Sequence, residues 1–356
     1  MKPKSVTLYD VAEYASVSYQ TVSRVINQAS HVSEKTRLKV EAAMNALNYV
    51  PNRVAQQLAG KLSHTIGLAT TNLALHAPSQ IVAAIKSKAG EMQFNVVISM
   101  IEQPGLEASK AAVNSLLSQR VDGLIVNIPL EDAEALEIQR RCGDIPALFL
   151  DVSPQLVANH IVFDPTLGAS LGVEHLVGLG HQKIALLNGP LSSISARLRF
   201  EGWQQSLAAH QLTASAVMQG DWSSLSGYQQ VNQLLRDGQI PGAILVANDQ
   251  MALGALRALS ESGLAVPTEV SVVGYDDTED SACFIPPLTT IKQDFKRLGQ
   301  VSVDHLLALI RREETAAEIL PVSLVERKTT ASPGATTPHE LAEALTRLVQ
   351  QVARLK

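Results

Sequence analysis

The chain has 356 residues, of which 46% are hydrophobic and 18% charged, and its formal net charge is −5. This length exceeds one ordinary core and predicts two or three domains. No segment approaches the roughly 20 uncharged apolar residues that cross a bilayer, and the N-terminus has no secretory signal, so we expect a cytoplasmic protein. Cys142 and Cys283 lie far apart in the sequence, which argues against a disulfide framework and favours buried free thiols.

The net charge hides an asymmetry along the chain. Residues 1–62 hold eight Lys or Arg against four acids, a charge of +4, which leaves −9 on the remainder. A small basic head on an acidic body indicates that only the head meets a polyanion such as nucleic acid.

Three short helical patterns fill the head, at residues 8–15, 19–27 and about 33–47, with Ser33 as the cap of the third. Only residues 16–18 separate the first two helices, which is the spacing of a helix-turn-helix. The turn position that favours glycine, because its φ is positive, is occupied by Ser16.

A short segment, NRVAQQLAG, follows the head. Asn52 can cap its start and Gly60 can end it. The run between them has about eight residues, fewer than the roughly 12 to 15 that an isolated helix needs in water. We therefore expect it to fold only against a partner; a plain linker is the alternative.

From residue 64 the pattern changes to alternating strands and helices. A first series has strands at 64–72, 95–102, 122–129 and 145–153, with helices from Ser79, Gly105 and Glu131; a second has strands at 183–190, 216–222, 243–249 and 270–277, with helices from Ser195, Leu225 and Gln250. Such alternation predicts an α/β core of parallel sheets with helices on both faces. Two series predict two lobes, with a ligand cleft beyond the carboxyl ends of the strands.

The tail begins with SPGATTP and continues as HELAEALTRLVQQVARLK. Its apolar residues step by four, three, four and three, which is the seam of a coiled coil. Because little over two heptads is short for a stable pair, a bundle of four such helices is favoured. The alternative is an amphipathic helix folded back on the core. The seam residues are Leu341, Leu345, Leu348, Val352 and Leu355.

The sequence contains no catalytic constellation. It has no GxSxG, HExxH or GxxxxGK[ST] motif, and its histidines are not paired at metal-ligand spacing. The segment YDDTEDS from Tyr275 to Ser281 is acidic, but it lacks the glycine and the terminal Glu of a calcium loop. We expect no enzyme activity, no metal and no cofactor.

Polar side chains follow four of the predicted strands: Asn127, Asp151, Asn248 and Asp276. Each could simply cap the next helix. Four such groups around one cleft suit a ligand rich in hydroxyls, because carboxylate and amide oxygens accept from hydroxyl donors while amide NH₂ groups and arginine donate. Trp222 offers a flat apolar face for the C–H side of a sugar ring, although core packing is the commoner role of a tryptophan.

Motifs along the whole chain resemble those of the LacI/GalR family of transcription regulators. They are LYDVAEYASVSYQTVSRVINQ, NRVAQQLAG, LALHAPSQIVAAIKS, GPLSSISARLR, LVANDQMALGA, SVVGYDDTEDS, IPPLTTIKQDF and the tail with its leucine seam. The resemblance implies a helix-turn-helix head, a two-lobed core like that of periplasmic binding proteins and a coiled-coil tail. It also implies a repressor of a lactose-type operon, bound to double-stranded operator DNA with a pseudopalindromic sequence and released by a galactoside inducer.

The resemblance implies that Tyr19, Gln20 and Arg24 enter the major groove and contact base edges. An exposed helix of a protein–protein module is the alternative for this face. Further implied DNA contacts are Tyr9, Ser18, Thr21, Ser23, Asn27, His31 and Ser33 with phosphates, and Asn52, Gln56, Leu58 and Ala59 in the minor groove.

The galactoside site implied by the resemblance has twelve residues: Leu75, Ala77, Pro78, Ile81, Asn127, Asp151, Phe163, Arg199, Trp222, Asn248, Asp276 and Phe295. The implied assembly is a homotetramer built as a dimer of dimers, with core helices such as residues 79–92 in the dimer contact. The implied domains are a head at 1–49, a hinge at 50–61, a core at 62–331 and a tail at 332–356. Within the core, lobe one comprises about 62–163 and 294–321, and lobe two about 164–293 and 322–331.

Other functions remain open on the sequence. A regulator of the same family could answer to a different small molecule or need a corepressor. A protein of another class, a sugar-binding protein with the same core, is disfavoured by the basic head and by the missing secretory signal. An enzyme acting on sugars is the third alternative, and no residue constellation supports it.

Overall fold

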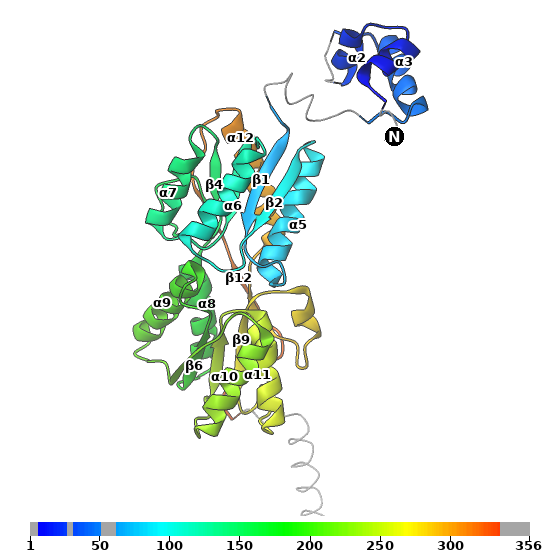
Figure 1. Ribbon diagram of the computed structural model, residues 1–356. Coiled ribbons are helices and arrows are strands. Elements are labelled where there is room, and N and C mark those ends of the chain that lie inside the picture. Colours follow the sequence, from blue (N-terminus) through cyan, green and yellow to red (C-terminus); the bar gives the residue numbers. More distant parts are fainter. Residues whose placement is uncertain (1–5, 27–30, 51–61, 335–356) are drawn as a thin grey trace, which may run out of the picture. The chain divides into compact units, whose positions relative to one another are not determined.

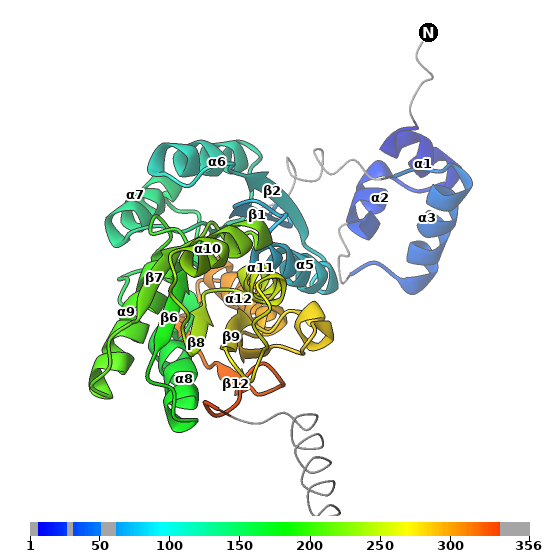
Figure 2. The same cartoon turned by 90° about the horizontal axis from the view of Figure 1, so that it is seen from below.

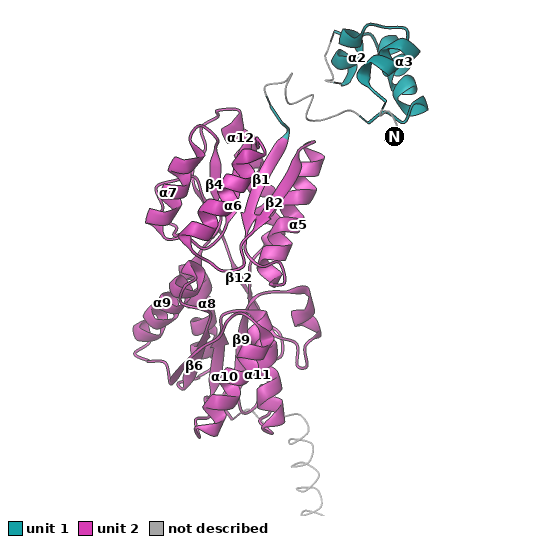
Figure 3. Ribbon diagram, viewed as in Figure 1, with its two compact units in different colours: residues 1–64 teal, residues 65–356 magenta. Residues whose placement is uncertain are grey.

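The computed structural model describes residues 6–26, 31–50 and 62–334. The chain divides into two compact units, residues 1–64 and 65–356 (Figure 3). The expected hinge and tail lie outside the described residues, and so do the following predicted site residues: Asn27, Asn52, Gln56, Leu58, Ala59, Leu341, Leu345, Leu348, Val352 and Leu355. Within the described ranges, every helix is too short or too polar to cross a bilayer.

The first unit contains three helices, α1 Leu8–Tyr14, α2 Tyr19–Ile26 and α3 Glu34–Ala46 (Figure 1). Hydroxyl groups set their starts: Thr7 and Asp10 form a capping box on α1, and the Ser33 hydroxyl accepts from the N–H of Thr36 at α3. One small cluster of buried side chains joins the helices: Val11, Ala12, Ala15, Val22, Val25, Val40 and Ala43.

The turn between α1 and α2 has the conformation that the sequence predicts. Ser16 has a φ of 50°, in the left-handed region. Its N–H donates to the carbonyl of Glu13, and the N–H of Val17 donates to the carbonyl of Ala12. These bonds close the last turn of α1 and direct the chain into α2, which gives the helix-turn-helix geometry.

Lobe one of the second unit contains a parallel sheet in the order β2-β1-β3-β4. An isolated bridge from Phe149 to His160 connects it to the parallel pair of β5 and β11. Because alternate strand residues face opposite sides, α5 and α12 pack on one face and α6 and α7 on the other (Figure 1). The bounds are β1 Thr65–Thr70, α5 His76–Glu91, β2 Asn95–Met100, α6 Leu106–Ser118, β3 Gly123–Asn127, α7 Asp132–Cys142, β4 Ala147–Phe149, β5 Ile161–Phe163, α12 Phe295–Ile310 and β11 Glu318–Leu320.

Lobe two contains a six-stranded sheet in the order β12-β10-β9-β8-β6-β7, in which β12 alone is antiparallel to its neighbour. Helices α8 and α9 pack together on one face, and α10 and α11 on the other (Figure 2). The bounds are α8 Pro165–Gly178, β6 Ile184–Asn188, α9 Ile194–Ala209, β7 Ala216–Gln219, α10 Ser224–Arg236, β8 Ala243–Val246, α11 Asp249–Glu261, β9 Ser271–Asp276, the 3₁₀ helix η1 Glu279–Cys283, β10 Thr289–Lys292 and β12 Ser323–Val325.

The chain passes between the lobes after β5, after β10 and after β11. These three crossings connect the lobes, and the lobes can open or close about them. The carboxyl ends of strands from both sheets carry residues that line one cavity. This placement is the one that parallel sheets impose on their ligands.

Two features differ from the sequence-based expectation. Helix α5 begins at His76, three residues before the predicted Ser79, because Pro78 lies in the first turn, where a missing N–H costs no intrahelical bond. Helices α8 and α12 and strands β5, β10, β11 and β12 were not predicted. Glycines and small residues in α8, such as Gly168 and Gly172, pack against lobe two and weaken its helical pattern.

Candidate functional site

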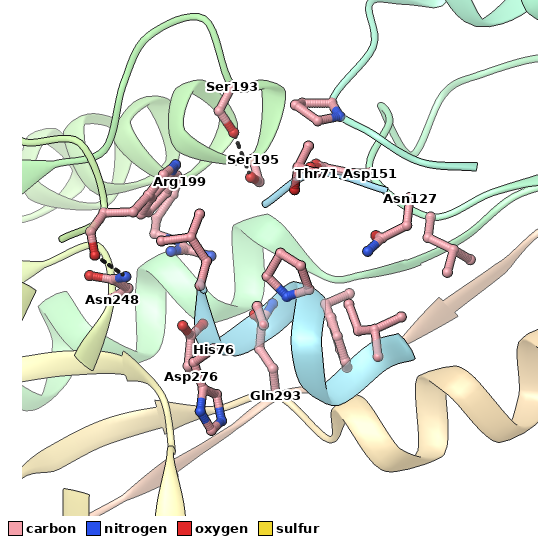
Figure 4. A pocket seen from close by; sticks show the side chains of 18 of the residues that line it. Thr71, His76, Asn127, Asp151, Ser193, Ser195, Arg199, Asn248, Asp276 and Gln293 are labelled. Carbon is pink, nitrogen blue, oxygen red and sulfur yellow. Dashed lines mark hydrogen bonds between the residues drawn. The ribbon is translucent and has the colours of Figure 1, made fainter. Parts of the chain in front are cut away.

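A cavity of about 590 Å³ lies in the core and is lined by residues of both lobes (Figure 4). All twelve residues that the family resemblance implies for a ligand site line this cavity: Leu75, Ala77, Pro78, Ile81, Asn127, Asp151, Phe163, Arg199, Trp222, Asn248, Asp276 and Phe295. They come from segments more than 200 residues apart in the chain. Their meeting is therefore a product of the two-lobed fold.

Arg199, on α9, is the buried cation of the cavity, with 6% of its surface exposed. Its guanidinium donates to the carbonyl of Ala247. It lies 3.4 Å from the ring centroid of Tyr275 and 5.9 Å from that of Trp222. Two aromatic faces and a carbonyl thus fix the guanidinium, which can donate to a bound ligand without reordering.

Two carboxyl groups face Arg199 from different lobes. Burial raises the pKa of Asp151 to about 6, although the charge of Arg199 and a hydrogen bond from Ser195 act in the opposite direction. Burial also raises the pKa of Asp276 well above its usual range; Arg199 lowers it, and the charge of Asp249 raises it further. The cavity therefore combines a fixed donor with two carboxyls that burial makes harder to ionise.

Asn248 is both a helix cap and a cavity residue. Its Oδ1 accepts from the N–H of Met251, 2.9 Å away, and caps α11. Its Nδ2 donates to the carbonyl of Trp222 at 3.0 Å (Figure 4). The capping role that the sequence left as an alternative is therefore correct for Asn248, and the same side chain anchors Trp222.

Trp222 has an unusual backbone, with a φ of 76°. A Cβ atom added at Gly189 would lie 2.4 Å from the end of the indole, so the ring packs directly on that glycine. The bond from Asn248 holds the backbone of Trp222, and the contact with Gly189 sets the position of its indole. A fixed, flat ring at the cavity wall suits the C–H face of a sugar.

Apart from His76, the residues that α5 and α12 place at the cavity are apolar. Leu75, Ala77, Pro78 and Ile81 come from the start of α5, and Phe295 from the start of α12. The ring of Phe163 meets that of Phe295 edge to face, with centroids 5.7 Å apart. This wall can bury an apolar substituent of a ligand but cannot orient its hydroxyls.

Asn127 supplies a polar group on the lobe-one side, at the end of β3. It is 6% exposed, and its Nδ2 lies 3.4 Å from the hydroxyl of Thr70. Asp151 follows β4 on the same sheet. The four polar residues predicted at strand ends thus line one cavity, two from each lobe: Asn127, Asp151, Asn248 and Asp276.

Several cavity residues were not predicted. Tyr275 supports Arg199, and the Oε1 of Gln250 accepts from the N–H of His76 at 3.1 Å, which joins the lobes. Gln250 lies two residues after Asn248 in the first turn of α11, a position that the strand-end pattern does not reach. The remaining unpredicted polar residues at the cavity include Thr71, Asn72, Glu102, Ser193, Ser195, Asp221 and Gln293.

Helix α2 of the first unit exposes Tyr19, Gln20 and Arg24, while Val22 and Val25 are buried beneath it. The other predicted DNA contacts of the head differ in exposure and in their hydrogen bonds. Tyr9 and His31 are exposed, and the centroid of the Tyr9 ring lies 5.4 Å from that of Tyr19. Ser23 is half-buried. The hydroxyl of Ser18 accepts from the N–H of Thr21 and caps α2, and Ser33 caps α3.

A metal site is not evident in the described part of the chain, where no three His, Cys, Asp or Glu side chains form a cluster that could hold an ion.

Comparison with known proteins gives matches for both units. Residues 7–52 match bacterial regulatory proteins of the lacI family, and residues 173–330 match periplasmic binding protein-like domains. The chain is 63% identical to the lactose operon repressor of Escherichia coli (strain K12), over 100% of this chain and 99% of that protein. It is also similar to two structures of the Lac repressor, each 64% identical and covering 92% of this chain and 100% of the other. One is a dimer bound to operator and the anti-inducer ONPF, with a TM-score of 0.88. The second is bound to ONPG in the repressed state, with a TM-score of 0.87.

Proposed function

The chain belongs to the lacI family of bacterial regulatory proteins, and we propose that it is the repressor of a lactose-type operon, released from its operator by a galactoside. The proposal rests on one observation above all: a helix-turn-helix unit and a cavity between two lobes occur in one chain that matches a lactose operon repressor from end to end. The protein is a DNA-binding regulator and not an enzyme. It needs no cofactor, because the galactoside acts as a ligand.

In this proposal α2 reads the operator. Arg24 donates to the paired acceptors of a guanine, Gln20 to an adenine or a mixed edge, and Tyr19 contacts the neighbouring base. The remaining head residues, Tyr9, Ser18, Thr21, Ser23, Asn27, His31 and Ser33, fix the register on phosphates. Two heads reading a pseudopalindrome, with half-sites about one helical turn apart, bind tighter than one.

The cavity offers what a galactoside requires. Arg199 donates to ring hydroxyls, Asp151 and Asp276 accept from them, and Trp222 covers the C–H face. Solved Lac repressor structures hold ONPF or ONPG, which supports a ligand of galactoside type. The apolar wall of α5 and α12 then receives the substituent on the anomeric oxygen.

Release follows from coupled equilibria. We assign residues 1–49 to the head, 50–61 to a hinge that folds on DNA, and 62–331 to the two-lobed core. Asn52, Gln56, Leu58 and Ala59 of the hinge enter the minor groove, and Leu58 kinks the duplex. A galactoside that prefers a core arrangement with separated hinges lowers operator affinity, and the operator lowers galactoside affinity by the same factor.

The assembly is a dimer of dimers in this proposal. Residues 332–356 form the linker and the tetramerisation helix, with Leu341, Leu345, Leu348, Val352 and Leu355 in its seam. The helix α5, His76–Glu91, contributes to the dimer contact. The protein acts in the cytoplasm, and on the nucleoid when it is bound to its operator. Truncation after residue 338 is expected to give dimers in sedimentation equilibrium, and unchanged tetramers would refute the tail assignment.

The experiment is fluorescence anisotropy of a labelled lac-type operator, at one stated salt concentration, with and without isopropyl thiogalactoside. We expect tight binding that weakens at least about tenfold with the galactoside, a coupling of about 1.4 kcal/mol. A scrambled duplex of the same length is the control for sequence-independent binding. Tight binding that ignores the galactoside would refute the inducer, and failure to bind would refute the repressor.

A further inference from the structure

Three consecutive residues at the start of α11 bond to three different segments of the core, and two of them line the cavity. Asn248 donates to the carbonyl of Trp222, and Gln250 accepts from the N–H of His76 in lobe one; both line the cavity. Asp249, between them, does not line it and has no exposed surface. A fully buried carboxyl that makes no contact with the cavity needs a different role.

The Asp249 carboxylate is held by three donors. Its Oδ2 accepts from the N–H of Thr278 at 2.9 Å and from the hydroxyl of Ser281 at 2.5 Å, and its Oδ1 accepts from the hydroxyl of Thr290 at 2.6 Å. It forms no ion pair with any Lys, Arg or His of the described ranges. The carboxylate is satisfied by hydrogen bonds and by the N-terminus of α11, in whose first turn it lies.

Two of these donors lie just beyond Asp276, where the backbone is strained. Asp276 and Asp277 have φ values of 118° and 58°, a conformation that side chains rarely adopt. Such strain persists only where the surroundings enforce it. Thr278 and Ser281 follow within five residues, so the bonds to Asp249 secure the strained turn from the inside.

A second clamp holds the same turn from the other side. Arg327 donates to Asp277 at 2.6 Å and to the carbonyl of Leu288 at 2.8 Å, and Lys292 lies 3.7 Å from the second oxygen of Asp277. Within the described ranges no ion pair is formed by Asp276, which lines the cavity and lies near the charge of Arg199. Asp249 and Arg327 therefore fix the turn from two sides, and the carboxyl of Asp276 remains available to the cavity.

Strand β9 is also adapted to Asp249. A Cβ atom at Gly274 would lie 2.2 Å from the Asp249 Oδ1 and 2.7 Å from a methyl group of Leu288. Only a residue without a side chain lets the carboxylate approach the strand this closely. Gly274 is two residues before Asp276, so this contact lies at the same end of β9 as the cavity.

From this geometry we propose that Asp249 is a positioning residue of the effector site: through Thr278, Ser281 and Thr290 it holds the turn after Asp276 and so sets where Asp276 presents its carboxylate. The proposal rests on the proposed function, because it takes the cavity as the galactoside site. Asp249 touches no ligand in it. Its effect on binding is transmitted entirely by the backbone and by its charge.

The charge of Asp249 should also change the pH dependence of galactoside affinity, which a purely structural role would leave unchanged. Asp249 raises the pKa of Asp276, while Arg199 lowers it, and Tyr275 and Asp277 are its titratable neighbours in the chain. Galactoside affinity falls on the acid side as Asp276 and Asp151, whose pKa burial raises to about 6, are protonated and stop accepting from hydroxyls. Burial raises the pKa of Asp249 itself to about 6, so Asp249→Asn removes a charge that is present above that pH. Without it the pKa of Asp276 falls, and the part of the acid limb that belongs to Asp276 should move to lower pH.

The test compares full-length Asp249→Asn and Asp249→Ala with wild type, by titration calorimetry with isopropyl thiogalactoside between pH 5 and 8. Asparagine keeps the size of the side chain; its oxygen can still accept from Thr278, and its amide can donate to a rotated hydroxyl. We expect Asp249→Ala to weaken the galactoside at least about tenfold. For Asp249→Asn we expect a smaller loss and an acid limb shifted to lower pH.

Hydrogen exchange without ligand supplies an independent readout. Amides 276–283 should exchange faster in both variants, while the rest of lobe two keeps its protection. Glu269→Gln is the matched control, because Glu269 is an exposed carboxylate of the same lobe that accepts from the N–H of Ala265 at 2.8 Å. It should change neither readout.

Unchanged exchange at 276–283 in both variants would overturn the positioning role, whether or not a galactoside binds. An Asp249→Asn variant with wild-type affinity and an unmoved acid limb would overturn it as well. Wild-type protein that does not bind the galactoside, together with faster exchange in the variants, would instead refute the proposed effector and leave the positioning of Asp276 supported.

Discussion

The head and the core place their functional side chains in opposite environments. In the head, Tyr19 is 48% exposed and Arg24 is exposed, and small buried residues such as Val22 hold the helix from below. In the core, Arg199 is 6% exposed and Asp276 is 6% exposed. The head presents groups that meet their partner from water, whereas the core has removed its groups from water before any ligand arrives.

The difference has an energetic consequence. A charge buried away from water is costly unless it is paired and hydrogen-bonded, so each buried group of the core depends on its neighbours. An exposed arginine keeps its hydration and depends on few neighbours. Changes in the core should therefore alter stability and binding together, while changes on α2 should alter binding alone.

The largest effect is expected from Arg199→Leu. The cavity loses its donor, the Ala247 carbonyl loses its partner, and the pKa of Asp151 and Asp276 rises further because the cation that lowers both is gone. We expect galactoside affinity to fall about a hundredfold, near 3 kcal/mol, by calorimetry. The free energy of unfolding should also fall, by about 1 to 3 kcal/mol in urea titrations.

Arg257→Leu is the matched control for this substitution. Arg257 lies in the same lobe, its side chain is 70% exposed, and it pairs with Glu261 one turn away. The control should leave galactoside affinity unchanged and alter stability by less than about 0.5 kcal/mol. Equal losses in the two variants would contradict the account of Arg199.

The next effect is expected from Arg24→Ala in the head. Loss of a base contact should weaken operator binding by about 2 kcal/mol, roughly thirtyfold, with little change in stability. Lys39→Ala removes the same charge from α3 and should weaken operator and scrambled DNA equally. Anisotropy with both duplexes checks this. If Arg24→Ala also weakened the two duplexes equally, α2 would be a phosphate contact and not a reader of bases.

A smaller effect is expected from Gly189→Ala. The new methyl group would lie 2.4 Å from the Trp222 indole, so the ring must move, while the bond from Asn248 still holds the backbone of Trp222. We expect galactoside affinity to fall about fivefold, with a changed tryptophan emission maximum. Gly178→Ala, at an exposed helix end with no atom near the new Cβ, should change neither. Unchanged emission and affinity in Gly189→Ala would show that the indole position does not matter.

The smallest effect is expected at the ion pair between Glu131 of lobe one and Arg197 of lobe two. Both side chains are partly exposed, so a double-mutant cycle with Glu131→Gln and Arg197→Gln should give about 0.5 kcal/mol of coupling, roughly a twofold change in galactoside affinity. The pair between Lys110 and Glu137, within lobe one, is the control and should give no coupling to the ligand. A larger value would show that the ion pair controls lobe closure.

The same contrast explains what the sequence could predict. The exposed face of α2, which we propose reads the operator, follows from a local pattern, because buried Val22 and Val25 define the opposite side of one helix. The strand-end residues Asn127 and Asp276 were predictable because parallel strands deliver their carboxyl ends to one cleft. Each inference needs only local periodicity and one rule of topology.

Other parts depend on tertiary packing that periodicity does not record. Asp249 and Asn248 are adjacent in sequence, yet one bonds to a strained turn and the other to Trp222, a distinction set by the position of β9 and β10 around α11. The sequence pattern gives Tyr275 no role beyond that of a strand residue, because its contact with Arg199 depends on the packing of α9. Helix α12 was not predicted as a helix, although residues 294–321 were assigned to lobe one, on which it packs.

The most direct test asks whether operator binding at the head and galactoside binding in the cavity are coupled. Calorimetric titration of isopropyl thiogalactoside should be performed on the free protein and on the protein saturated with operator, in the same buffer and salt. Linkage requires operator to weaken the galactoside by the factor, at least about tenfold, by which the galactoside weakens the operator. Identical galactoside affinities in the two titrations would contradict the proposal that this chain is an inducible repressor.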